Sequence, residues 1–301
     1  MVARNITHVV ADGVSLAVHR IGRGAPVVCL TALGHDARDF DGLAERIADR
    51  FEIICIEWPG HGESADDHQP VGAGRYGDLL VETLDQLAPG SPILIGNSIG
   101  GAAAIHYASR RPIRGLVLCN SGGLVAVTPL VQRFCRVLQR FFAAGERGAR
   151  WFGPAFWAYY HLVLTQPAAS RQRRRIIAGG RRHARLLRQG WESFGQANAD
   201  ISEIAAALQV PIWIAYADRD KIIPLSYCLP AIRRMRNATL SQFKAGHSAF
   251  LEQPDAFASG FLDFVSRLPD AAVRGTVSAS ATKGQTRVPV PAMLDIAGPR
   301  A

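Results

Sequence analysis

A serine among closely spaced glycines is the first sign of chemistry in this chain. Ser98 lies in the run GNSIGG at 96–101, which matches the pattern G-x-S-x-G. The apolar run PILI at 92–95 predicts a buried strand before it, and an Ala-rich run that ends at Pro112 predicts a helix after it. A serine at the tight turn between such elements can act as a nucleophile, and the backbone N–H of Ile99 would face a developing oxyanion.

The run at 96–101 resembles the nucleophile elbow of the α/β-hydrolase superfamily, and a second motif carries the same resemblance. The segment EWPGHGES at 57–64 is similar to a turn, D-x-P-G-H-G-x-S, that is common in that superfamily, with Glu57 in place of Asp. Its Pro and Gly residues shape a turn, which favours a structural role for His61. The resemblance implies an acid and then a histidine downstream of the serine, in that order.

Both expected partners of the serine occur in that order. The segment ADRDKIIP at 217–224 resembles the superfamily's acid loop, in which the catalytic Asp stands four residues before Pro; Asp220 has that spacing, and Asp218 is the alternative. The segment AGHSAFLEQP at 245–254 resembles the histidine loop. The resemblance therefore implies that His247 is the general base and that Asp220 orients it and stabilises the imidazolium.

The loop after the predicted strand at 25–30 departs from the family pattern. α/β-Hydrolases usually carry His-Gly here, followed by a residue whose backbone N–H completes the oxyanion hole. In this chain Thr31 and Ala32 stand at those positions, and Leu33 takes the place of the donor. Because a backbone donor needs no particular side chain, we expect Leu33 and Ile99 to supply the two N–H groups.

The predicted elements alternate as they do in an α/β fold. An antiparallel hairpin is expected at 6–18, and apolar strand runs and amphipathic helix patterns then alternate up to residue 121. The same alternation returns in the last part of the chain. This order predicts a mostly parallel, doubly wound sheet. The resemblance implies that it is the α/β-hydrolase fold, with residues 1–121 and 203–268 as its core.

The interruption between the two core segments predicts a cap. Residues 122–202 contain no convincing strand and show helical spacing at 130–144, 149–164, 168–177 and 183–194. Many α/β-hydrolases insert helices over the active site at this place, so the resemblance implies an all-helical cap at 122–202. Residues 269–301 are low in complexity and rich in Ala, Gly, Ser, Thr and Pro, which predicts a disordered tail.

Two features of the predicted cap bear on the substrate. Aromatic residues are concentrated at 151–160. They can form the core of the cap itself, but a cap that covers an apolar pocket also has a face toward the substrate, and some of these residues should lie on it. We therefore take four of them as candidate substrate contacts: Trp151, Phe152, Trp157 and Tyr160. Eight arginines at 171–188 form the densest charge in the chain, either as a solvated face or as a surface for an anionic substrate or acyl carrier.

The composition of the chain argues against several other classes of protein. The chain of 301 residues has no apolar run of bilayer length and no apolar stretch typical of a secretion signal at its N-terminus, so we expect a cytoplasmic enzyme without a membrane span. Its five cysteines lack the spacing of a disulfide framework or a zinc site. The net charge of +9 comes without a nucleic-acid recognition motif. We expect no cofactor, no metal and no nucleic-acid partner.

The resemblance implies a serine hydrolase that cleaves an ester, thioester or lactone of a small to medium apolar acyl group through an acyl-enzyme on Ser98. The motif G-N-S-x-G-G is also frequent in C–C bond hydrolases of the same fold, but their H-G-S-G-P-G loop is absent from residues 31–36. That activity is the first alternative. The second is a ligand-binding or receptor member of the fold that keeps these residues without using them for catalysis.

Overall fold

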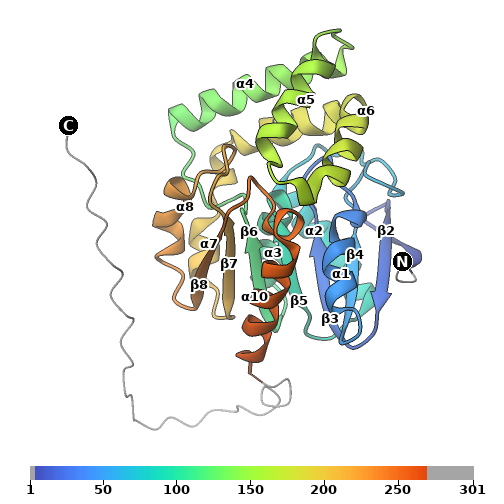
Figure 1. Ribbon diagram of the computed structural model, residues 1–301, viewed down its shortest axis with the longest axis vertical. Coiled ribbons are helices and arrows are strands. Elements are labelled where there is room, and N and C mark those ends of the chain that lie inside the picture. The colour runs from blue at the N-terminus through green and yellow to red at the C-terminus, as the bar shows by residue number, and fades with distance from the viewer. Residues whose placement is uncertain (1–3, 270–301) are drawn as a thin grey trace, which may run out of the picture. The chain divides into compact units, whose positions relative to one another are not determined.

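Short apolar runs form the centre of one eight-stranded sheet (Figure 1). The computed structural model describes residues 4–269, so the predicted tail lies, from residue 270 onward, outside the described residues. The central strands are buried along nearly their whole length, as parallel strands covered on both faces must be. They are β3 (Ala25–Leu30), β4 (Phe51–Ile56), β5 (Ile93–Asn97), β6 (Gly115–Cys119) and β7 (Ile212–Ala217).

The sheet has the order β1-β2-β4-β3-β5-β6-β7-β8. The predicted entry hairpin is present: β1 (Arg4–Ala11) pairs antiparallel with β2 (Val14–Gly22), which pairs antiparallel with β4. All further pairs are parallel, out to β8 (Ala238–Phe243) at the edge. In the sheet, β4 lies on one side of β3 and β5 lies on the other, so the direction in which strands are added reverses at β3. The loops after the strands diverge at such a reversal and leave room for a ligand.

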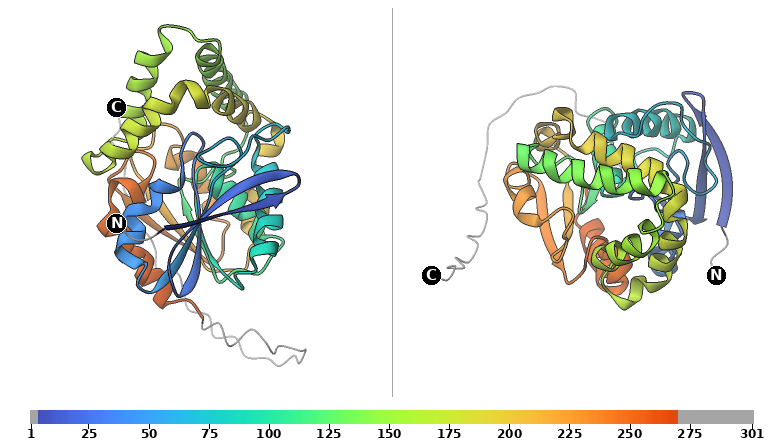
Figure 2. Two further views of the ribbon diagram at one scale, coloured as in Figure 1. Left: turned by 90° about the vertical axis from the view of Figure 1, so that its right-hand side faces the viewer. Right: turned by 90° about the horizontal axis from the view of Figure 1, so that it is seen from above.

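Helices cover both faces of the sheet (Figure 2). α1 (Asp41–Ile47) and α10 (Pro254–Ser266) pack together on one face, and α2 (Ala73–Leu87) and α3 (Ile99–Ala108) pack together on the other. The other helices outside the insertion are η1 (Ala37–Phe40), α7 (Ser202–Ala207), α8 (Leu225–Ile232) and α9 (Ala249–Glu252). α8 begins directly after Pro224 and contains Pro230.

The insertion between β6 and α7 is helical and lies over the end of the sheet at which β5 and β7 terminate (Figure 1). It consists of α4 (Pro129–Glu146), α5 (Phe152–Val163), α6 (Ser170–Phe194) and the short helices η2 (Pro167–Ala169) and η3 (Ala197–Ala199). The bounds 122 and 202 of the cap stay a prediction. Within residues 4–269, no helix is both long and apolar enough to cross a membrane.

The sequence predicted two helices at 168–177 and 183–194, and this is wrong: the structure has the single helix α6. The predicted gap contains Gly179 and Gly180, which weaken a helix locally. Gly180 has a packing role instead, since a Cβ added there would lie 2.2 Å from the ring of Phe156 on α5. The absence of a side chain lets the Phe156 ring press against the α6 backbone.

We predict that Gly180→Ala lowers the free energy of unfolding by about 1–3 kcal/mol, because the buried Phe156 ring has to move to admit a methyl group. Gly153→Ala is the matched control, because a Cβ at this helical position meets no heavy atom within 4 Å. Urea unfolding of both variants checks the difference. Equal free energies of unfolding for the two variants would contradict it.

Candidate active site

Ser98 occupies a strained turn between β5 and α3. Its backbone has φ 55° and ψ −120°, a conformation that L-residues rarely adopt outside functional sites. The neighbouring chain is too close for side chains: a Cβ at Gly96 would lie 2.5 Å from the carbonyl oxygen of Gly100, and one at Gly100 would lie 2.5 Å from that of Leu30. The two glycines of the motif are therefore steric requirements of this turn.

His247 and Asp220 come together although 27 residues separate them. His247 Nδ1 lies 2.7 Å from Asp220 Oδ2, and the two side chains are 5% and 1% exposed. Asp220 Oδ1 accepts the backbone N–H groups of Ile222 and Ile223 at 2.7 and 3.0 Å. Asp218 is exposed, and its side chain makes no hydrogen bond within the described part of the chain. The structure thus brings Asp220, and not Asp218, to the imidazole.

Two asparagines hold these loops in place. Asn120, which follows β6, donates from Nδ2 to Asp220 Oδ2 at 2.7 Å, and its Oδ1 accepts the N–H of Ala217 at 2.8 Å. Asn97, next to the serine, donates to the backbone oxygen of His247 at 3.3 Å. Its side-chain oxygen also accepts the Ser248 hydroxyl at 2.9 Å. The histidine loop is therefore fastened to the residue that precedes Ser98, and no sequence motif pointed to either asparagine in this role.

The Ser98 hydroxyl makes no hydrogen bond with the His247 ring among residues 4–269. Because Nδ1 faces Asp220, the other ring nitrogen, Nε2, is the one left for the serine. Contacts of this kind are often long in structures without substrate and tighten when it binds. The described geometry therefore supplies the oriented imidazole and leaves the last hydrogen bond to be formed.

The loop after β3 is held firmly despite its departure from His-Gly. Trp58 Nε1 donates to the carbonyl oxygen of Thr31 at 2.9 Å, and Gly34 N–H donates to His61 Nε2 at 2.8 Å. His61 thus has the structural role that its turn motif indicated. Within the described ranges, the backbone N–H groups of Leu33 and Ile99 donate no hydrogen bond, so both remain free for an oxygen of a ligand.

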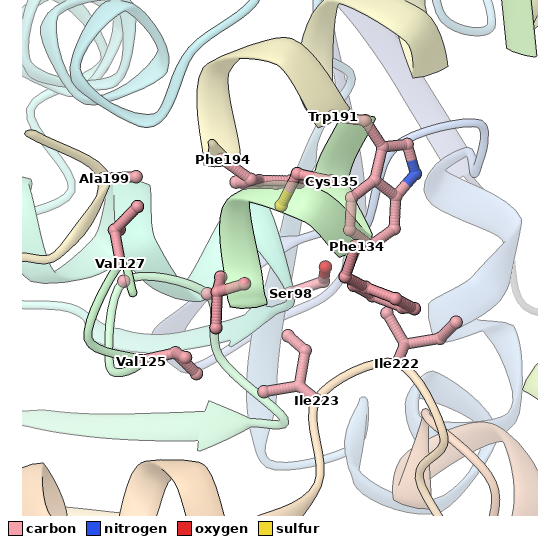
Figure 3. Close-up of a pocket in the computed structure, with 13 residues that line it drawn as sticks. Ser98, Val125, Val127, Phe134, Cys135, Trp191, Phe194, Ala199, Ile222 and Ile223 are labelled. Carbon is pink, nitrogen blue, oxygen red and sulfur yellow. The ribbon is translucent and has the colours of Figure 1, made fainter. Parts of the chain in front are cut away.

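An apolar cavity of about 90 Å³ lies beside Ser98 (Figure 3). Its walls come from α4, from the C-terminal end of α6 and from the loop after Asp220, and they include Val131, Phe134, Cys135, Trp191, Phe194 and Ile223. Phe134 is also 40% exposed, so α4 forms part of the rim. Among the described residues, no three His, Cys, Asp or Glu side chains are grouped so that they could hold a metal ion.

The four aromatic residues expected to contact substrate do not line this cavity. Trp151 and Trp157 are each 55% exposed on the cap surface. Phe152 is buried against Phe156 in the core of the cap, and the Tyr160 hydroxyl lies 3.3 Å from a ring nitrogen of His35. The cavity uses α4 instead, where an i, i+3, i+4 spacing of Val131, Phe134 and Cys135 was the available signal.

Two buried histidines differ in their electrostatics. Burial of the His247 ring opposes its charged form, but the charge and hydrogen bond of Asp220, with a smaller effect of Glu252, outweigh burial and raise the pKa of His247. Burial of His61, together with the nearby His183, lowers its pKa to about 4. Asp220 therefore makes His247 a stronger base than a histidine in water, while His61 stays neutral at physiological pH.

We predict that NMR titration gives His247 a pKa above the ordinary value of about 6.5, and His61 a pKa of about 4. Asp220→Asn removes the stabilising charge and should bring the pKa of His247 below that of the unmodified chain. His61 has no contact with Asp220 and should titrate unchanged. An unaltered pKa of His247 in Asp220→Asn would contradict the assigned cause.

The chain is similar in sequence to a known protein family and to curated esterases. The model of the alpha/beta hydrolase family matches residues 27–259. The pimeloyl-[acyl-carrier protein] methyl ester esterase of Stenotrophomonas maltophilia is 27% identical over 271 residues, covering 83% of this chain and 96% of that protein. The protein of the same name from Xanthomonas campestris pv. campestris is 28% identical over 267 residues, covering 83% and 98%.

Solved structures are similar in fold, although their sequences have diverged. An esterase from Exiguobacterium antarcticum matches with a TM-score of 0.74 at 18% identity, covering 88% of this chain and 100% of that one. An enol-lactonase from Burkholderia xenovorans matches with a TM-score of 0.71 at 18% identity, covering 87% and 100%. Sheet order, elbow geometry and the matched family model agree with the fold expected from the sequence, and the chain belongs to the alpha/beta hydrolase family.

Proposed function

We propose that the chain hydrolyses carboxylic esters through an acyl-enzyme formed on Ser98. The observation that carries this proposal is the 2.7 Å hydrogen bond between His247 and Asp220, in a loop fastened to the residue before the strained serine. Buried imidazole–carboxylate pairs next to a serine are the arrangement that acyl transfer requires. The curated relatives, which are named as methyl ester esterases, support the same reaction type.

In the proposed mechanism His247 Nε2 accepts the proton of the Ser98 hydroxyl as Oγ attacks the ester carbonyl carbon. The N–H groups of Leu33 and Ile99 stabilise the oxyanion of the tetrahedral intermediate. The intermediate collapses, the C–O bond to the alcohol breaks, and the imidazolium returns its proton to the leaving oxygen. Water then attacks the acyl-enzyme with His247 again as base, while Asp220 keeps the ring oriented and stabilises the imidazolium.

The apolar cavity favours an apolar group next to the scissile bond, because its walls offer little to a charged one. The relatives' printed name combines a methyl ester with an acyl group on an acyl carrier protein. We therefore propose that this chain also acts on a methyl ester whose acyl group is attached to a carrier. The cavity would hold the reacting end while the carrier stays outside.

The positive charge of the cap supports an anionic partner. Arginines of α4 contribute to this charge as well as the arginine cluster on α6. Arg175 pairs with Asp36 and Asp39 and joins the cap to the core. Arg188 pairs with Glu146 and Glu192 and joins α6 to α4 within the cap. α4, which forms the rim of the cavity, has three exposed arginines without an ion pair among the described residues: Arg133, Arg136 and Arg140. An acidic carrier docked there would stand next to the opening.

The alternatives have less support. Neither the named relatives nor the loop at 31–36 favours C–C bond cleavage, and a receptor role leaves the oriented His247 and Asp220 without a use. Thioester and lactone cleavage would use the same groups and differ only in the leaving atom. The cytoplasmic location expected from the sequence stays a prediction.

We predict that Ser98→Ala lowers kcat for p-nitrophenyl butyrate by about 10⁴-fold or more, because the acyl-enzyme cannot form. A fluorophosphonate probe should label the unmodified chain and should not label this variant. Ser109→Ala is the matched control, since Ser109 is exposed at the end of α3. Fluorophosphonate labelling or ester turnover that persists in a folded Ser98→Ala protein would contradict the proposal.

We further predict that Arg133→Ala combined with Arg136→Ala lowers kcat/KM for a carrier-bound methyl ester by about tenfold at low salt, because electrostatic attraction speeds encounter. The rate on a small free methyl ester should not change. The control is Arg236→Ala, an exposed arginine near the edge strand β8. Equal losses on both substrates, or no loss on the carrier-bound one, would speak against docking on α4.

A further inference from the structure

Glu252 is a buried carboxylate that the proposed mechanism does not use. It ends the short helix α9, five residues after His247, and is 3% exposed. No arginine, lysine or histidine pairs with it among the described residues. A buried anion without a cation is costly unless hydrogen-bond donors surround it, so its donors define its role.

One oxygen of Glu252 binds the loop that carries the base. Oε1 accepts the backbone N–H groups of Gly246 at 2.8 Å, His247 at 3.0 Å and Ser248 at 3.3 Å. Three successive N–H groups directed at one oxygen fix the path of the backbone through His247. The orientation of the imidazole therefore depends on Glu252 as well as on Asp220.

The other oxygen binds the cap. Oε2 accepts the backbone N–H of Thr165 at 2.7 Å, its hydroxyl at 3.0 Å and the N–H of Gln166 at 3.0 Å. These two residues lie within the cap, between α5 and η2. A second contact joins the same segments: a Cβ at Gly246 would lie 2.2 Å from the carbonyl oxygen of Val163.

We propose that Glu252 is a positioning residue that couples the cap to the catalytic base, so that the linker at 164–166 and the histidine loop move as one unit. The proposal rests on the esterase function above. Separating the two segments would leave a buried carboxylate oxygen without its three donors, which keeps them together. A substrate or carrier that shifts the cap would thereby change the position of His247 relative to Ser98.

The charges around His247 provide a readout that distinguishes this role from simple support of the fold. Asp220 bonds the ring from the loop after β7, and the charge of Glu252 acts on it from α9. From the cap, Tyr159 lies near Asp220, and burial with that charge raises its pKa, so it stays neutral. Loss of the negative charge at Glu252 should therefore lower the pKa of His247.

The test is Glu252→Gln, whose NH₂ group cannot accept hydrogen bonds, so one of the two segments loses its acceptor. For p-nitrophenyl butyrate we expect kcat to fall by about ten- to a hundredfold with little change in KM, because misplacing the base slows the chemistry without weakening binding. The acid limb of the kcat/KM profile should move to lower pH. Asp255→Asn is the charge-matched control, since the Asp255 carboxylate is 89% exposed nearby, and it should leave both quantities unchanged.

A second variant, Thr165→Val, removes one donor to Glu252 while keeping the shape of the side chain. It lies in the cap linker and does not touch the ring, so a fall in kcat of about two- to tenfold supports coupling. Its effect should vanish in the Glu252→Gln background, since both changes break the same link. If Glu252→Gln does not fold, Thr165→Val alone decides, and an unchanged kcat overturns the coupling.

The outcomes separate this inference from the proposed function. Absence of Ser98-dependent ester hydrolysis in the unmodified chain would remove the esterase assignment itself. Normal hydrolysis in the unmodified chain, with kcat and the acid limb unaltered in a folded Glu252→Gln protein, would overturn only the role of Glu252. A loss of thermal stability without either kinetic change would also overturn it.

Discussion

Crowding of the backbone around Ser98 is the constraint on which the rest of the structure depends. The residue is held at a positive φ because β5 must turn at once into α3, and Gly96 and Gly100 leave no space for a relaxed alternative. The strain is sustained by the sheet, since the Ser98 N–H donates to the carbonyl oxygen of Cys119 at 3.1 Å. The parallel core therefore determines where the hydroxyl stands.

Three buried carboxylates in this protein accept hydrogen bonds from backbone N–H groups. Asp220 accepts two of them, Glu252 accepts five, and Glu57 accepts those of Ala37 and Glu63. Such donors are fixed by the fold and cannot rotate away as a lysine can. Each acid thus holds a loop in one conformation, and together they align the loops at the carboxyl ends of neighbouring strands.

The cap is joined to the core at more than one place. Arg175 reaches from α6 to Asp36 and Asp39 beside the loop after β3. A Cβ at Gly190 of α6 would lie 2.1 Å from the side chain of Leu33, so the cap also rests on the residue expected to donate to the oxyanion. Both loops that the proposed chemistry needs are consequently in contact with the cap, and its position is part of the geometry of the site.

The sequence by itself determined the fold and identified a serine, an acid loop and a histidine as candidates for catalysis, because these depend on local patterns: apolar strand runs, a glycine-flanked turn and loops of recognisable spacing. Only the tertiary structure decided which residues line the cavity, that α6 is one helix, and that Asn120 and Glu252 hold the base in place. These features arise from contacts between segments far apart in the chain, such as Gly180 against Phe156. Hydrophobic periodicity identifies which face of a helix is buried, but not which element packs against that face. The sequence therefore suggested that aromatic residues at 151–160 contact the substrate, whereas residues of α4 line the cavity.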